Sequence, residues 1–197
     1  LGILMYWHIH SGSCAPAACN LPSLITLSEI PRDTMESSAI INLPDEAATI
    51  ALARGLAPCV AQGAVIYLRG ELGAGKTTFA RALLQALGAG ERIKSPTYSL
   101  LERYRVGERD AFHLDLYRIA AADELRWLGL DELHEPSAVV LVEWPERGAG
   151  RLPPADLELA LEHARPQGRN ARLRALSSRI RLDAATDRQA IASRNGR

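Results

Sequence analysis

The chain has 197 residues, of which 47% are hydrophobic, and its 23 acidic and 23 basic residues give a formal net charge of zero. This size and composition argue for one domain with one buried core rather than for two domains. The apolar run Leu1–Ile9 is far shorter than the roughly 20 residues of a membrane span, and it lacks the basic flank of a signal peptide. Cys14, Cys19 and Cys59 are odd in number and lack C-x-x-C spacing, so neither a disulfide framework nor a zinc site is predicted, and a cytoplasmic location is expected.

The N-terminal segment differs in composition from the rest of the chain. Residues 11–38 are crowded with Gly, Pro, Ser and Cys and show neither helical nor strand periodicity, whereas regular patterns begin soon after Met35. We therefore expect translation to start at Met35. Residues 1–34 would then be an extension that is either disordered or upstream of the true start, and the folded domain is expected at residues 35–177.

The first regular elements precede a glycine-rich loop. A short strand is predicted at residues 40–41. The acidic turn after Pro44 then opens a helix, because carboxylates favour a helix N-terminus, and Pro58 is expected to end that helix. The apolar run Ala64–Leu68 is short enough to be a buried strand.

The later elements continue the alternation of helices and strands. They are a helix at Thr77–Leu87 ended by Gly88, strands at Ala111–Leu116, Ala138–Val142 and Leu157–Leu161, and a helix at Asp123–Leu133. From the residues alone, this order predicts an α/β domain and no more.

The glycine-rich loop carries the strongest functional signal. Residues 70–77 read Gly-Glu-Leu-Gly-Ala-Gly-Lys-Thr and match G-x-x-x-x-G-K-[ST], in which glycines let successive backbone N–H groups surround phosphate oxygens. Lys76 would reach the β- and γ-phosphates, Thr77 would offer its hydroxyl to Mg²⁺, and the following helix would point its positive end at the same anion. The alternative is a glycine turn that fits the pattern by chance, and the strand and helix on either side argue against it.

Two further carboxylates could serve a bound nucleotide. Glu143 ends an apolar strand, which is how a Walker B element brings an acid to the metal, although a solvated strand end is the alternative. His113, Asp115 and Tyr117 share one face of a strand because side chains alternate. Asp115 could hold metal-bound water or the attacking water, or it could form a structural ion pair with an arginine, and His113 by itself is expected to be structural.

The segment after the phosphate-loop helix resembles a nucleotide switch. It reads Lys-Ser-Pro-Thr-Tyr at residues 94–98, and a hydroxyl such as that of Thr97 can sense the γ-phosphate and the metal in nucleotide switches. The residues alone equally fit an ordinary Ser-Pro turn, which is the commoner meaning of this pattern.

Taken in order, these motifs resemble the bacterial TsaE family. The matching motifs are Leu43-Pro44-Asp45-Glu46, the phosphate loop with Thr78, Ser95-Pro96-Thr97-Tyr98, His113-Leu114-Asp115-Leu116-Tyr117-Arg118, Glu143-Trp144-Pro145-Glu146 and Gln167-Gly168-Arg169. The resemblance runs from about Ile40 to about Leu176 and depends on several ordered motifs. It implies a three-layer α/β P-loop NTPase domain with a mixed central sheet.

The resemblance also implies a function and partners. Members of this family are ATPases that act with TsaB and TsaD in making N6-threonylcarbamoyladenosine at position 37 of tRNAs that read ANN codons. TsaD carries the transfer chemistry, while ATP binding and hydrolysis by the TsaE protein act on the TsaB–TsaD complex. On this basis the expected cofactors are ATP and Mg²⁺, and tRNA would be engaged indirectly through the complex, with no membrane involved.

Carried over by position, the resemblance assigns roles to individual residues. The phosphates would be held by Gly73, Ala74, Gly75, Lys76, Thr77 and Thr78, the metal by Thr77 and Glu143, and the nucleotide would be bordered by Glu46 and Arg169. Asp115 and Lys76 would be catalytic, and Ser95 and Thr97 would be switch-like. Separately from the resemblance, Trp144 follows the proposed metal ligand Glu143 directly, so its emission is expected to report site occupancy. One residue is inserted before Gln167 relative to the family pattern, so the position of Arg169 depends on the alignment there.

Other functions remain open at this point. A small-molecule kinase would share the loop and could use Arg169, Arg172 and Arg174 as a phosphate clamp, and a nucleotide-dependent assembly module would bind ATP without turnover. A GTPase is disfavoured because neither Lys76 nor Lys94 lies in an Asn/Thr-Lys-x-Asp guanine reader. The Arg-rich tail at 178–197 is either a solvated extension or a contact with tRNA phosphates.

Overall fold

A computed structural model of the chain describes residues 38–128, 130–180 and 182. The expectations for residues 1–34 and for most of the tail at 178–197 lie outside this part and stay predictions. The elements in chain order are β1 (Ser38–Leu43), α1 (Glu46–Val60), β2 (Ala64–Gly70), α2 (Lys76–Leu87), β3 (Leu101–Val106), β4 (Arg109–Asp115), the 3-10 helices η1 (Ala122–Leu128) and η2 (Leu130–His134), β5 (Val139–Glu143), the 3-10 helix η3 (Pro145–Gly148), β6 (Leu157–His163) and β7 (Arg169–Ala175).

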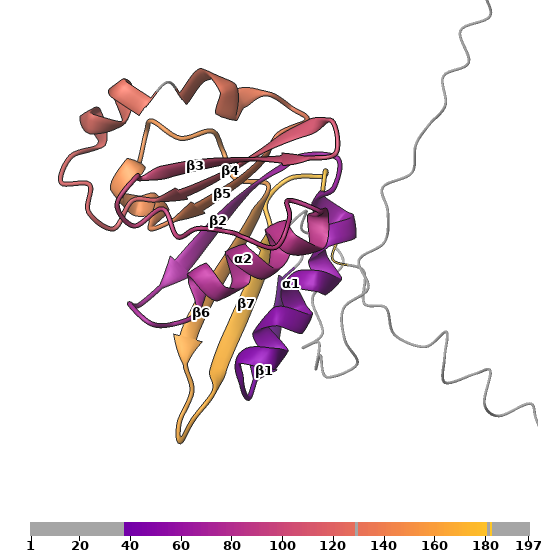
Figure 1. Cartoon of the computed structure of the whole chain (residues 1–197). Helices are drawn as coiled ribbons and strands as arrows, with labels where there is room; N and C mark the ends of the chain where they lie inside the picture. Colours follow the sequence, from indigo (N-terminus) through magenta and orange to yellow (C-terminus); the bar gives the residue numbers. More distant parts are fainter. Residues whose placement is uncertain (1–37, 129, 181, 183–197) are drawn as a thin grey trace, which may run out of the picture.

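The seven strands form one sheet in the order β1-β7-β6-β2-β5-β4-β3 (Figure 1). The four central strands, β6, β2, β5 and β4, are parallel to one another. The flanking pairs β1–β7, β7–β6 and β3–β4 are antiparallel. The expected α/β fold with a mixed central sheet is therefore confirmed.

Side chains along the central strands point alternately to the two faces of the sheet, and each face packs against its own hydrophobic core. On β5, Val139 and Leu141 pack in the cluster that contains the buried residues of α1 and α2. Val140 and Val142 point to the opposite face, where they pack with Leu125 of η1. Figure 1 shows α1 and α2 together on one side of the sheet and the 3-10 helices near the other. The sheet therefore lies between a layer of α-helices and a layer of short 3-10 turns and loops.

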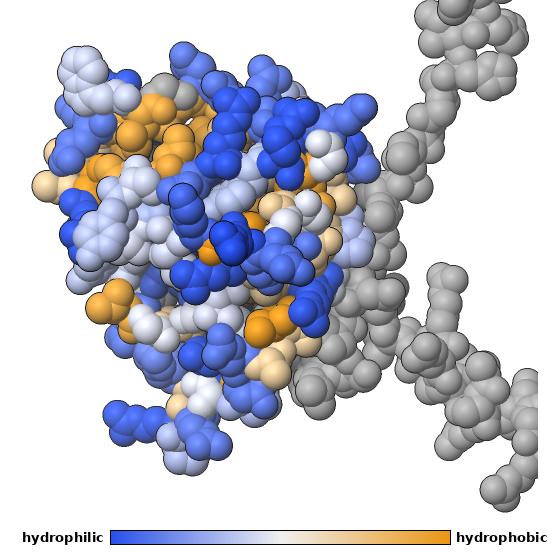
Figure 2. Space-filling view, in the orientation of Figure 1, coloured by the Kyte–Doolittle hydropathy of each residue, from blue (hydrophilic) through white to orange (hydrophobic). Residues whose placement is uncertain are grey.

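The molecular face in Figure 2 is mostly polar, with small and separate hydrophobic patches. This matches the two buried clusters, which hold most of the large apolar side chains of the described residues. Among the described helices, none has the length and apolar character that crossing a membrane requires.

Three local expectations differ from the structure. Pro58 does not end α1, which runs on to Val60 with the proline inside the helix. The described residues of the segment expected as one α-helix, 123–128 and 130–133, lie in two 3-10 helices instead. Cys59 is disulfide-bonded, so the expectation that the cysteines stay unpaired is wrong at this position.

The strands β3 and β7 were not expected, because their sequences are rich in arginine. In β7, buried Ala171 and Leu173 alternate with exposed Asn170 and Arg172, so one face packs on the core and the other is solvated. Pairing with β1 and β6 on its two sides then stabilises β7 although it is not an apolar run.

Asp156, just before β6, ties the end of the domain to the sheet. Its carboxylate accepts hydrogen bonds from the backbone N–H of Val65 at 2.9 Å, from Ser177 Oγ at 2.5 Å and from Arg179 Nη1 at 3.2 Å. Arg179 also donates to the backbone oxygens of Gly63 at 2.8 Å and Pro136 at 2.6 Å. The segment after β7 is thereby fixed against the start of β2.

We predict that Asp156→Ala lowers the free energy of unfolding by about 2–4 kcal/mol, because it leaves the buried N–H of Val65 unpaired and removes a charged acceptor. Urea unfolding followed by circular dichroism measures the change. Asp123→Ala is the matched control, since Asp123 pairs with Arg151 on the surface and its loss should leave the unfolding midpoint close to that of the parent. Equal midpoints for the two variants would contradict this account.

Candidate functional site

A cavity of about 420 Å³ lies where β2, β4 and β5 end and α2 begins. The carboxyl ends of neighbouring parallel strands are the usual place for ligands in open α/β sheets. The cavity is lined by the phosphate-loop residues Gly73, Gly75, Lys76, Thr77 and Thr78, and by Thr97, Asp115, Glu143, Trp144 and Arg169 among others. Most of the predicted site residues are therefore brought to one place.

The phosphate loop has the backbone conformation that its glycines permit. Gly73 and Gly75 have φ of 78° and 104°, in the left-handed region that side chains disfavour. Gly75 is the N-cap of α2, and no side chain caps the helix there. The first N–H groups of α2 are thus free of a side-chain acceptor, and an anion would find these donors together with the positive end of the helix dipole.

Lys76 is buried and folds back onto its own loop. Its Nζ donates hydrogen bonds to the backbone oxygens of Gly70 at 2.7 Å and Glu71 at 2.8 Å. Nζ also lies 4.1 Å from the centroid of the Trp144 ring. Burial lowers the pKa of the Lys76 ammonium, while Glu143 and other nearby carboxylates oppose that shift. The ammonium therefore stands between the phosphate loop and the acidic strand ends.

Glu143 is held at both carboxylate oxygens. Thr77 donates its hydroxyl to Oε2 at 2.9 Å, and His113 Nε2 lies 2.9 Å from Oε1. The side chain of Glu143 is only 3% exposed. The solvated strand end considered from the sequence is therefore wrong for Glu143.

Asp115 connects the end of β4 to the switch-like segment. Its Oδ1 accepts from the backbone N–H of Tyr117 at 3.0 Å, and its Oδ2 accepts from Thr97 Oγ1 at 3.3 Å. Thr97 Oγ1 is in turn 2.9 Å from Ser95 Oγ. Within the part of the chain that the structure describes, Asp115 forms no ion pair with an arginine. Its partners are the Thr97 hydroxyl and the Tyr117 N–H, in place of the Asp–Arg pair considered from the sequence.

Trp144 has an unusual backbone conformation beside these acids. Its φ of 59° and ψ of 49° are left-handed, and its N–H donates to the backbone oxygen of Leu68 at 3.2 Å. The ring is 5.1 Å from that of Tyr117, centroid to centroid, and Arg147 lies near both rings. Trp144 thus forms one wall of the cavity in contact with Lys76.

The remaining predicted residues lie at different distances from the cavity. Arg169 lines it, and a Cβ at Gly75 would lie 3.1 Å from Arg169 Nε. Ala74 is fully buried behind the loop, and Ser95 reaches the site through Thr97. Glu46 is exposed at the start of α1 and does not line the cavity. Roles for Glu46 and Arg169 at a nucleotide stay predictions.

The donor set suits a hard divalent cation that arrives with phosphate. Thr77 and Glu143 offer oxygens 2.9 Å apart, and Asp115 lies on the adjacent strand in register with Glu143. Among the described residues, no group of three or more His, Cys, Asp or Glu could hold a metal. Mg²⁺ typically binds through one or two protein oxygens together with phosphate and water, so the residues present fit it.

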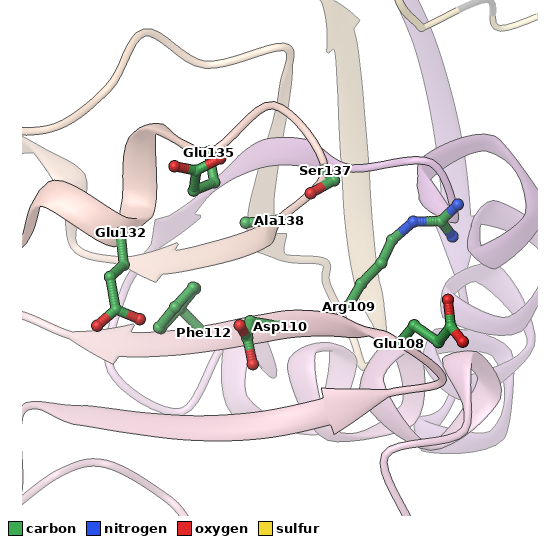
Figure 3. Close-up of a pocket in the computed structure, with 8 residues that line it drawn as sticks. All are labelled: Glu108, Arg109, Asp110, Phe112, Glu132, Glu135, Ser137 and Ala138. Atoms are coloured by element: carbon green, nitrogen blue, oxygen red, sulfur yellow. The ribbon is translucent and has the colours of Figure 1, made fainter.

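A second cavity, of about 250 Å³, lies between the start of β4 and the segment before β5 (Figure 3). Figure 3 shows Glu132 and Glu135 on one side and Asp110 and Arg109 on the strand. Asp110 and Glu132 already pair with Arg103, and the lining includes no glycine loop. This cavity has none of the features of a phosphate site.

Sequence reasoning missed two contacts in the site. The hydrogen bond between His113 and Glu143 joins two neighbouring strands. The one sequence feature that pointed toward it was that His113 and Asp115 share a face of their strand. The contact of Lys76 with Trp144 depends on the turn after β5, which no local pattern predicts.

Comparisons with known proteins agree with this arrangement. A family model described as threonylcarbamoyl adenosine biosynthesis protein TsaE matches residues 43–171. The tRNA threonylcarbamoyladenosine biosynthesis protein TsaE of Haemophilus influenzae is 41% identical over 99 residues, covering 50% of this chain and 63% of that protein. The protein of the same name from Bacillus subtilis is 34% identical over 139 residues, covering 71% of this chain and 85% of that protein.

A solved structure is also similar. The crystal structure of Bacillus subtilis YdiB superposes with a TM-score of 0.60 at 30% identity, covering 75% of this chain and 92% of that chain. The likeness supports the P-loop NTPase fold that the family resemblance implied. With the family model spanning the phosphate loop, both acidic strand ends and Arg169, the chain belongs to the TsaE family, which is named for threonylcarbamoyladenosine biosynthesis.

Proposed function

We propose that this chain is a Mg²⁺-dependent ATPase that supports formation of N6-threonylcarbamoyladenosine at position 37 of tRNAs reading ANN codons. The observation that carries the proposal is one cavity that joins the uncapped start of α2, the buried Lys76, and the carboxylates of Glu143 and Asp115. Each of these groups has a use at a triphosphate.

Binding would come from several charge-assisted contacts at once. Hydrogen bonds to charged groups contribute about 1.5–3 kcal/mol each, so the loop N–H groups with Lys76 supply enough to reach micromolar affinity after the cost of ordering. Lys76 would exchange the backbone oxygens of Gly70 and Glu71 for phosphate oxygens. Those two oxygens hold the ammonium in place until phosphate arrives.

The protein's own groups would orient the attacking water. Asp115 keeps acceptor lone pairs after its bonds from Tyr117 and Thr97, so it can take a hydrogen bond from water at the γ-phosphate. Mg²⁺, when bound with ATP, would neutralise charge that develops on the phosphate oxygens. The overall reaction is ATP plus water giving ADP and inorganic phosphate.

The expected partners are TsaB and TsaD, and the expected location is the cytoplasm. This chain offers a nucleotide site, so we assign the transfer to tRNA to TsaD and assign ATP turnover to this chain. The tRNA would be engaged through the complex rather than directly.

The geometry favours this function over the two open alternatives. The case for a kinase, which would use three arginines to bind phosphate, is weak. Of Arg169, Arg172 and Arg174, only Arg169 lines the cavity. Arg174 instead lies 3.4 Å from Glu158. A non-catalytic assembly module would not require Asp115 to face the same cavity as Lys76.

We predict that Lys76→Ala weakens ATP binding by about 10- to 100-fold, because it removes a charged donor to phosphate. Isothermal titration calorimetry with Mg²⁺ present measures the affinity. Lys94→Ala is the matched control, since Lys94 is exposed and does not line the cavity, and it should bind as the parent does. An unchanged affinity for Lys76→Ala would refute the assignment of the site.

Asp115→Ala should retain ATP binding within about threefold and lose turnover by at least about 100-fold, since general-base catalysis commonly contributes that much. Phosphate release is measured with TsaB and TsaD present and without any acceptor metabolite. Asp110→Ala on the same strand is the control, because Asp110 pairs with Arg103 away from the cavity. Full turnover in Asp115→Ala would reject a catalytic role for Asp115. Binding of ATP without any turnover in the parent would favour an assembly module, and strict dependence on an acceptor would favour a kinase.

Tryptophan emission should report nucleotide binding through Trp144, which contacts Lys76. Trp127→Phe should keep the change in emission on adding MgATP, because Trp127 is 90% exposed and outside the cavity. Trp144→Phe should lose the change while calorimetry still detects binding. A full signal in Trp144→Phe would contradict the placement of the nucleotide beside this ring.

A further inference from the structure

We infer that His113 is a positioning residue for the metal-binding carboxylate of Glu143. The inference rests on the proposed function, because it assumes that Glu143 serves Mg²⁺. It concerns a residue that by its sequence was expected to be merely structural.

Strand register brings the two side chains together. In the parallel pair β4–β5, His113 lies opposite Leu141 and Asp115 lies opposite Glu143. His113 and Glu143 are therefore diagonal neighbours, and alternation places both on the face that carries α2. The imidazole thus meets the carboxylate from the sheet side, while Thr77 meets it from the start of α2.

The two oxygens of the Glu143 carboxylate have different partners. Oε1 is 2.9 Å from His113 Nε2, and Oε2 accepts the hydroxyl of Thr77 at 2.9 Å. The Thr77 hydroxyl is itself a proposed metal ligand, so its bond to Oε2 is the one that metal binding would alter. The bond to His113 can persist, and it fixes the orientation in which Oε2 faces the cavity.

The surroundings of His113 define which nitrogen carries the hydrogen. The imidazole is fully buried, and its Nδ1 has no hydrogen-bond partner among the described residues. A carboxylate can only accept, so Nε2 must be the donor to Glu143. Since Nδ1 has no partner, the only hydrogen bond of the described chain that orients this ring is the one to Glu143.

Groups that orient a metal ligand typically change metal affinity or activity by 10- to 100-fold when removed. His113→Asn and His113→Gln make a matched polar pair. The Gln amide extends to about the position of Nε2, whereas the shorter Asn amide reaches only about as far as Nδ1. Gln can therefore donate to Glu143 and Asn cannot.

The test compares the affinity for a non-hydrolysable ATP analogue with Mg²⁺ and with EDTA, by calorimetry on the full chain. We expect His113→Asn to lower the Mg²⁺-dependent gain in affinity by about tenfold or more while the affinity in EDTA stays within about twofold. His113→Gln should keep most of the gain. Phe112→Leu, a buried change on the opposite face of β4, should leave the gain intact.

Two results would overturn the inference while leaving the proposed function in place. One is an undiminished gain in His113→Asn, and the other is equal loss in His113→Asn and His113→Gln. Failure of the parent chain to bind the analogue with Mg²⁺ would instead reject the proposed function. Nitrogen-15 NMR of the parent avoids any folding defect of the variants: the spectrum should show hydrogen on Nε2 of His113, and a ring that carries hydrogen on Nδ1 alone would reject the inference.

Discussion

The structure depends on a backbone turn between β2 and α2 that requires glycine at specific positions. Gly73 and Gly75 adopt left-handed φ there, and Gly70 approaches β6 so closely that a Cβ would lie 2.2 Å from the backbone oxygen of Leu161. This turn aims the N–H groups at the start of α2 into the cavity. Lys76 and Thr77, the first residues of α2, then have positions fixed by the helix rather than by a flexible loop.

The parallel centre of the sheet supplies the acids in the same way. Because β4 and β5 are adjacent, parallel and in register at Asp115 and Glu143, their carboxylates emerge at one edge. The strand β2 ends beside them and delivers the phosphate loop. The position of each acidic strand end in the site therefore depends on how β2, β4 and β5 pair, although each acid is recognised from a short stretch of sequence.

The sequence allowed the loop, the central strands and the principal acids to be predicted, because each depends on a short pattern. Glycine spacing marks residues 70–77, and an apolar run ending in an acid marks Glu143. The rest required contacts between distant segments. Strand β7 is stabilised by neighbours on both sides despite its arginines, and the partner of His113 is thirty residues away in the chain.

Trp144 shows how the site and the fold constrain each other. A left-handed backbone at a residue other than glycine costs on the order of 1–3 kcal/mol, and it persists only where its surroundings require it. Here the chain leaves β5 directly after Glu143 and enters η3, whose first residue is Pro145. The bond from the Trp144 N–H to Leu68 and the contact of its ring with Lys76 offset that cost. The strained residue therefore follows the carboxylate of Glu143 directly and contacts Lys76, so the strain is located at the wall of the cavity.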